Sequence, residues 1–174
     1  RQSEDWDREE VSVGSYPYGE GAVMELSAAH GGALTIQEIY RLVNPAVVTV
    51  IAQLDRGASV GTGMIFREDG YVLTNYHVVA GSHDCSVTLA SGRTYEALYV
   101  GGDSGNDVAV LKIDGSNLPA LSLEYETPLR VGDVVLAIGN PFGLDGSMTT
   151  GIISALDRQL TINNQKLTLQ TIWV

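Results

Sequence analysis

His77 and Asp107 have the residue types and the settings that nucleophilic hydrolysis requires. His77 follows Tyr71–Thr74, where a strand is expected to end, and Asp107 stands thirty residues later, before the alternating apolar run Val108–Ile113. A carboxylate bonded to one imidazole nitrogen fixes the tautomer, and the other nitrogen can then take a hydroxyl proton. Taken separately, a His or an Asp in such a setting has a structural role more often than a catalytic one. Together they are candidates for a general base and its orienting acid.

Two further histidines and the single cysteine have settings that argue against catalysis. His30 lies in a Gly-rich stretch and His83 in a polar loop, so both are expected to be solvated. Cys85 directly precedes an expected strand and is interpreted as a buried free thiol. With one cysteine, the chain forms no internal disulfide.

Short strands separated by turns must position the candidate residues, and many such strands predict an all-β sandwich or barrel. A helix is predicted over Ile36–Val43, because Thr35 and Glu38 form a capping-box pattern and Pro45 ends the helical run. Turns are predicted at 68–70 and 91–92. The predicted strands cover residues 46–54, 59–66, 71–74, 86–90, 94–101, 108–113, 134–139, 149–156, 159–162 and 167–171.

Length and charge narrow the class of protein. The chain has 174 residues, 20 glycines and a net charge of −11, which fits one domain with or without a tail. The excess of acid argues against nucleic acid and anionic membranes as partners, since both require clustered Lys and Arg. Apolar runs such as Ala46–Ala52 fall short of the roughly 20 residues that span a bilayer. Residues 1–34 hold two basic and seven acidic residues and are predicted to form a flexible acidic tail.

Four segments together resemble the HtrA/Deg family of trypsin-like serine proteases. Their order and spacing match the family as well as their residues, and the resemblance extends over about 35–171. The segments that carry it are Gly61–Phe66, Gly70–Val79, Asn106–Ile113 and Val131–Leu144.

The resemblance implies a trypsin-like double β-barrel, with a complete first barrel over 35–125 and an incomplete second barrel over 126–174. By motif position it makes His77 the general base and Asp107 its orienting carboxylate. It also implies that 157–166 is a loop that senses activating ligands, and that the turn 140–144, which contains Phe142, borders the active-site groove.

Members of the family are typically endopeptidases of misfolded or exported proteins and commonly homotrimers, here with Tyr16, Tyr18 or the helix at 36–43 as candidate contacts. The implied location is outside the cytoplasm, in the periplasm or cell envelope, with a membrane anchor before Arg1 as an option. No metal or organic cofactor is implied.

The catalytic serine of the family is the point at which this sequence departs from the pattern. The family places that serine in a Gly-Asn-Ser-Gly-Gly motif shortly after a segment that matches Gln170-Thr171, whereas this sequence continues with Ile172-Trp173-Val174. Without the nucleophile the 174 residues alone are expected to be inactive. Three explanations stay open: a truncated or frame-shifted gene product, a piece of a longer protease, and a non-catalytic peptide-binding or oligomerisation module.

Two serines in the chain could be mistaken for the nucleophile. Ser104 lies in Gly102–Gly105, which spells Gly-Asp-Ser-Gly, but Asn106 follows it where a trypsin-type nucleophile motif continues with Gly-Pro. A turn before the strand of Asp107 is the better interpretation. Ser147 begins an expected strand and lacks a nucleophile motif.

Overall fold

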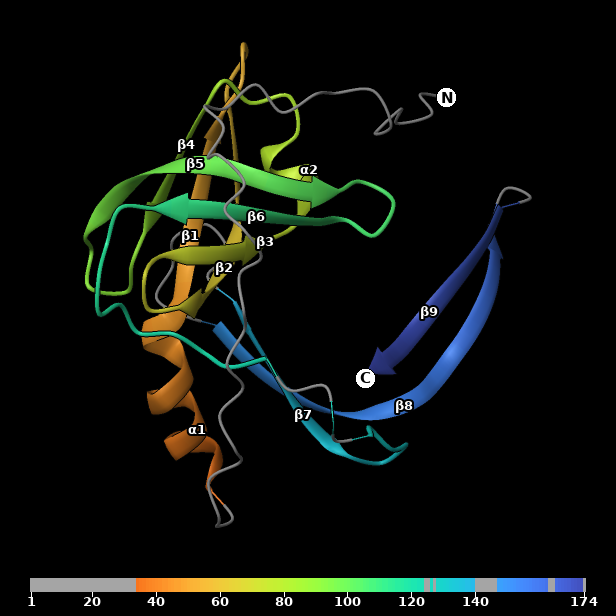
Figure 1. The fold of residues 1–174 in the computed structure, drawn as a ribbon. Helices are drawn as coiled ribbons and strands as arrows, with labels where there is room; N and C mark the ends of the chain where they lie inside the picture. Colours follow the sequence, from red (N-terminus) through yellow and green to blue (C-terminus); the bar gives the residue numbers. More distant parts are fainter. Residues whose placement is uncertain (1–33, 124–125, 127, 140–146, 163–164, 174) are drawn as a thin grey trace. The chain divides into compact units, whose positions relative to one another are not determined.

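The structure is a computed structural model that describes residues 34–123, 126, 128–139, 147–162 and 165–173. The chain divides into two compact units (Figure 1). Of the described residues, one unit contains 34–123 with the strand-end residues Gly139 and Ser147, and the other contains 126, 128–138, 148–162 and 165–173. His30, Tyr16, Tyr18, Phe142 and the predicted acidic tail up to residue 33 lie outside the described residues.

The first unit is a closed barrel of six strands in the order β1-β2-β3-β6-β5-β4, and every pairing is antiparallel. The predicted strands are confirmed, and β3 and β6 have the predicted bounds. The barrel strands are β1 Val47–Gln53, β2 Ala58–Arg67, β3 Tyr71–Thr74, β4 Asp84–Thr88, β5 Thr94–Asp103 and β6 Val108–Ile113. Strand β4 begins earlier than predicted, because Asp84 and Cys85 pair with Gln53 and Ala52 of β1. It also ends earlier, because Leu89–Gly92 forms a turn with a hydrogen bond from the Gly92 N–H to the Leu89 carbonyl.

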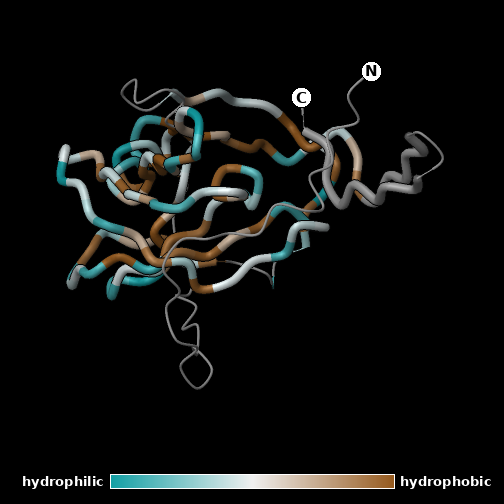
Figure 2. Tube along the Cα trace, turned by 90° about the horizontal axis from the view of Figure 1, so that it is seen from above, coloured by the Kyte–Doolittle hydropathy of each residue, from teal (hydrophilic) through white to brown (hydrophobic). Residues whose placement is uncertain are grey.

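The barrel interior is filled by aliphatic side chains, and the apolar stretches of the strands stand out in Figure 2. Strand β6 shows how the pattern works, because Ala109, Leu111 and Ile113 are buried and the residues between them are not. Strand β1 is buried along most of its length, as its continuous apolar run predicts. Each fully buried Val, Leu or Ile stabilises the fold by about 1.5–3 kcal/mol. This core gives the candidate site a rigid base.

Helix α1 (Ile36–Val43) precedes the barrel and begins with the predicted capping box. The Glu38 N–H donates to Thr35 Oγ1 over 3.3 Å, and the Thr35 N–H donates to the Glu38 carboxylate over 2.8 Å. A 3-10 turn, η2 (Asn44–Ala46), contains Pro45 and leads into β1. No residue of α1 is buried, and Leu42 is 63% exposed.

The second unit holds a three-stranded sheet in the order β7-β8-β9, made of β7 Val134–Gly139, β8 Ser147–Ile162 and β9 Gln165–Trp173. The prediction of two strands at 149–156 and 159–162 was wrong, because both belong to β8. The predicted loop at 157–166 was wrong for the same reason: backbone pairs continue from Ile153 with Trp173 to Ile162 with Gln165. The polar pair Asp157-Arg158 interrupts the apolar pattern but leaves the backbone groups that form the ladder in place.

Gly70 offers a test of the barrel geometry, because it has φ +100° and an added Cβ would collide with the Ile113 carbonyl oxygen. We expect Gly70→Ala to lower the free energy of unfolding by more than about 2 kcal/mol, from left-handed strain and the collision together. Gly92→Ala is the matched control, since Gly92 has φ +82° with open space around it. Gly92→Ala should lower the free energy of unfolding by only about 1 kcal/mol. Urea unfolding measures both, and equal losses would contradict the described packing of Gly70.

Candidate active site

His77 is carried by a single helical turn, α2 (Tyr76–Val79), that directly follows β3. Val78 and Val79 are buried in the core, which fixes the orientation of α2. His77 extends outward, and its side chain is 53% exposed. The imidazole is therefore held by a rigid element and is accessible to a substrate.

Asp107 stands at the end of the tight turn between β5 and β6. Its backbone is in the left-handed region, at φ +53°, which Asp tolerates better than most residues. Asp103 closes the turn, since its Oδ1 accepts the N–H groups of Gly105 and Asn106 over 2.9 and 3.1 Å. The predicted turn before the strand of Asp107 is confirmed, but it covers 104–107, because Gly102 and Asp103 belong to β5.

Sheet topology brings the two candidate residues together. Strand β3 is the antiparallel neighbour of β6, and Thr74 at the end of β3 pairs with Ala109 near the start of β6. The residues just after β3 therefore meet the residue just before β6. The 29 residues between His77 and Asp107 complete α2 and form β4 and β5, which follow β6 in the strand order of the barrel.

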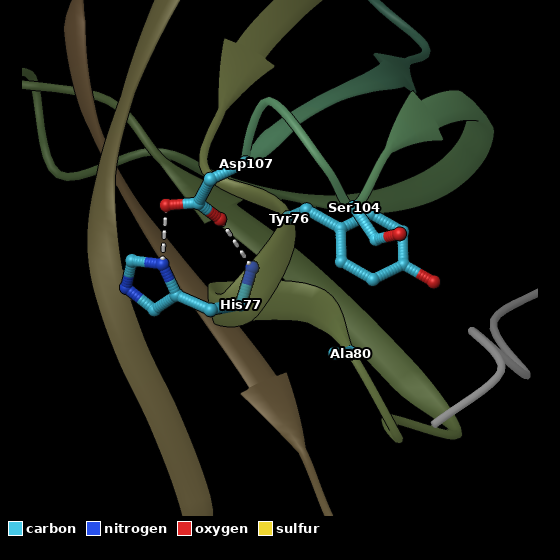
Figure 3. A pocket seen from close by; sticks show the side chains of 5 residues that line it. All are labelled: Tyr76, His77, Ala80, Ser104 and Asp107. Atoms are coloured by element: carbon cyan, nitrogen blue, oxygen red, sulfur yellow. Dashed lines mark hydrogen bonds and ion pairs between the residues drawn. The ribbon is translucent and has the colours of Figure 1, made fainter. Parts of the chain in front are cut away.

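One carboxylate contacts both the ring and the backbone of His77 (Figure 3). Asp107 Oδ2 lies 2.7 Å from His77 Nδ1, and Asp107 Oδ1 accepts the His77 N–H over 2.9 Å. An ionised carboxylate has no proton to give, so Nδ1 must be the donor. The Nε2 lone pair then remains on the other side of the ring, where a general base needs it.

The surroundings of Asp107 keep it ionised. Partial burial by itself favours the neutral acid, but the backbone N–H and imidazole of His77 and the amide of Asn75 favour the carboxylate, and the pKa of Asp107 lies below its usual range. Asp107 therefore carries a negative charge at neutral pH. That charge can stabilise an imidazolium formed when His77 accepts a proton.

A pocket of about 380 Å³ adjoins the pair and is lined by Tyr76, His77, Ala80, Ser104 and Asp107. The sequence did not anticipate that Ser104 lines this pocket. In Figure 3 the His77 imidazole lies next to the Asp107 carboxylate, and Ser104 lies away from the imidazole. The arrangement gives no support to Ser104 as the nucleophile.

The other singled-out residues that the structure describes make none of the contacts given above for His77 and Asp107. His83 is 54% exposed and lies 3.9 Å from Asp55, and Ser147 is the first residue of β8. Cys85 is a buried free thiol, as predicted, and burial and the nearby Asp84 charge raise its pKa to about 12. Among the described residues, no group of three or more His, Cys, Asp and Glu is placed to hold a metal ion. No helix in this part of the chain has the length and apolar character to cross a membrane.

Asn75 is a site residue whose role sequence reasoning missed. It is the residue before α2, and its Nδ2 donates to the Asp107 carbonyl over 3.2 Å and to Asp107 Oδ2 over 3.1 Å. Asn is a favoured N-cap residue, so its position before His77 was the available signal. That signal pointed to helix capping and not to Asp107.

Comparison with known proteins identifies one protein family over most of the described residues. The trypsin-like peptidase domain family matches residues 61–172. A DegP-like probable periplasmic serine endoprotease from Halomonas elongata is 54% identical over 102 residues, which are 59% of this chain and 22% of that protein. The chain spans about a fifth of the length of the curated relatives it matches.

Solved structures of similar proteins have the same fold as this chain. The serine endoprotease from Yersinia pestis has a TM-score of 0.67 and 38% identity, with 80% of this chain and 54% of that chain covered. The HtrA-type protease AlgW, solved with a tripeptide, has a TM-score of 0.65 and 45% identity, with 72% of this chain and 42% of that chain covered. The predicted all-β, trypsin-like double-barrel class is confirmed by this likeness and by the closed barrel and second sheet.

Proposed function

Because this chain belongs to the trypsin-like peptidase family and is of the HtrA type, we propose that it is part of a serine endopeptidase in which His77 is the general base and Asp107 orients it. The observation that carries the proposal is the double contact of Asp107 with the ring and the backbone of His77. This contact makes Nδ1 the protonated nitrogen of the neutral imidazole, so that Nε2 is the nitrogen that can accept a proton from a serine hydroxyl.

The proposed reaction is acyl transfer. His77 Nε2 takes the serine proton as the serine oxygen attacks the peptide carbonyl, and the carboxylate of Asp107 stabilises the imidazolium that forms. The imidazolium then gives this proton to the leaving amine. Water, deprotonated by the same nitrogen, resolves the acyl-enzyme and restores the hydroxyl.

The nucleophile in this proposal comes from chain outside the 174 residues. The family motif Gly-Asn-Ser-Gly-Gly does not occur in the sequence. The 174 residues alone should therefore leave casein intact, while the longer protein that contains the motif cleaves it. If the longer protein also leaves casein intact, the non-catalytic peptide-binding or oligomerisation module is the better account.

We also propose unfolded or misfolded polypeptides as substrates and a location outside the cytoplasm. The relatives named periplasmic serine endoproteases support the location. The substrate class is what the resemblance to the HtrA/Deg family implies. Cleavage of unfolded casein, compared with a folded protein of equal size, tests the substrate class. Equal rates would contradict it.

A homotrimer is the proposed assembly. Helix α1 supports it by exposing apolar side chains, with Ile36 41% and Leu42 63% exposed. Sedimentation equilibrium of the 174-residue chain should give three times the 18.5 kDa protomer mass. A chain that begins at Gly32 loses the candidate contacts Tyr16 and Tyr18 but keeps α1. It should sediment as a smaller species, and an unchanged mass would contradict a role of residues 1–31 and leave α1 as the contact.

A further inference from the structure

Asn75 contacts Asp107 at two points, at the backbone and at the side chain. The amide nitrogen of Asn75 has two protons, and it faces two acceptors, the Asp107 carbonyl at 3.2 Å and Oδ2 at 3.1 Å. Neither acceptor has a proton to give, so the nitrogen and not the oxygen of the amide must face them. The two N–H groups of the Asn75 amide therefore match the two acceptor oxygens of Asp107.

The usual role of an Asn at this position is absent. An Asn before a helix normally accepts a backbone N–H of the first turn through its side-chain oxygen, but Asn75 makes no such capping bond. Asp107 Oδ1 accepts the His77 N–H instead. The Asn75 side chain is directed to Asp107 because Asp107 has taken over the cap.

From these contacts we infer that Asn75 is a positioning residue of the catalytic pair, which fixes the plane of the Asp107 carboxylate and through it the orientation of His77. Asp107 Oδ2 accepts from Asn75 and from His77 Nδ1 at the same time. The bond to the Asp107 carbonyl ties the same amide to the backbone, which is held at φ +53°. Rotation of the carboxylate away from the imidazole would break the bond to Asn75 as well.

This inference rests on the proposed function for its effect on catalysis, but its geometry is testable without catalysis. The first readout is the pH titration of Asp107 in the 174-residue chain, followed by the NMR shift of its carboxyl carbon. Asn75→Ala should move the midpoint upward, because a donor to the ionised form is lost. The second readout is cleavage by the longer protein, where Asn75→Ala should lower kcat about 10-fold with KM little changed, since one hydrogen bond to a charged group is lost.

Two further variants separate positioning from stability. Asn75→Ser keeps a favourable N-cap residue, but its short side chain with one proton cannot serve both acceptors. It should retain the wild-type urea midpoint and still show the raised Asp107 titration and the lower kcat. Asn106→Ala removes a neighbouring amide that donates to Asp103 and not to Asp107. It should leave the titration of Asp107 unchanged.

Full recovery of the titration and of kcat in Asn75→Ser would overturn the inference, because capping would then explain the residue. An unchanged Asp107 titration in Asn75→Ala would overturn it too. If the wild-type longer protein cleaves nothing while the titration moves as expected, the proposed function fails and the contact between Asn75 and Asp107 stands.

Discussion

Replacement of His77 by alanine in the longer protein is expected to lower kcat for casein by roughly 10⁴- to 10⁶-fold. The imidazole is the only group in the described pair that can both take and return a proton at neutral pH, and alanine removes it. Because the His77 side chain is half exposed, its loss leaves no large cavity in the core. The far-UV spectrum and the urea midpoint should therefore stay close to wild type.

His83→Ala is the matched control for this prediction. His83 is exposed to the same degree, 54%, and lies 3.9 Å from a carboxylate, that of Asp55. The loss of His83 should leave kcat within about twofold of the wild-type value, because surface ion pairs of this kind contribute little to stability. A His77→Ala protein that retains even a tenth of the wild-type kcat would contradict the assignment of the base.

The second large effect is expected from Asp107→Asn, which should lower kcat about 10⁴-fold with KM little changed. The asparagine keeps the shape of the side chain but places an amide where Nδ1 needs an acceptor. When the amide nitrogen faces the ring, the proton of the neutral imidazole moves to Nε2 and the base is lost. The imidazolium also loses its stabilising charge. Single-turnover kinetics measures the chemical step directly.

The same variant should alter the dependence of stability on pH. Because the pKa of Asp107 is lowered in the folded chain, its ionised form contributes stability that is complete above the ordinary carboxyl pKa, about 3.9. This contribution is lost as the pH falls through the lowered pKa of the folded state. Wild type should therefore exceed Asp107→Asn in stability at pH 7 and approach it in strong acid.

Urea unfolding at a series of pH values measures this difference. The effect should be modest, because the Asp107 side chain is 44% exposed and solvent screens its charge. A stability difference that grows as the pH falls would have the wrong sign for a carboxylate stabilised in its ionised form.

The barrel was predictable because its strands and turns carry strong local signals. Alternation of apolar residues set the bounds of β6, and the capping box at Thr35 and Glu38 set the start of α1. The length of β8 was not predictable in the same way, because polar residues at 157–158 resemble a turn until the pairing partner in β9 is known. The extent of β8 is set by backbone pairing with β9, which sequence patterns do not show.

The candidate site was partly predictable. The types and settings of His77 and Asp107 suggested a pair, but their contact depends on β3 and β6 being neighbours in a closed barrel. The role of Asn75 required atomic detail, because local propensity predicts a cap and the structure instead directs the amide to Asp107. The position of Ser104 in the pocket likewise depends on how the β5–β6 turn folds.

The most direct test of the account is to locate the serine that a fluorophosphonate probe modifies in the longer protein. Peptide mass spectrometry after labelling identifies the residue. We expect one labelled serine, outside residues 1–174 and within a Gly-Asn-Ser-Gly-Gly motif, and we expect the label to disappear in His77→Ala. Labelling of Ser104, Ser147 or any other serine of the 174 residues, or labelling that persists without His77, would contradict the account.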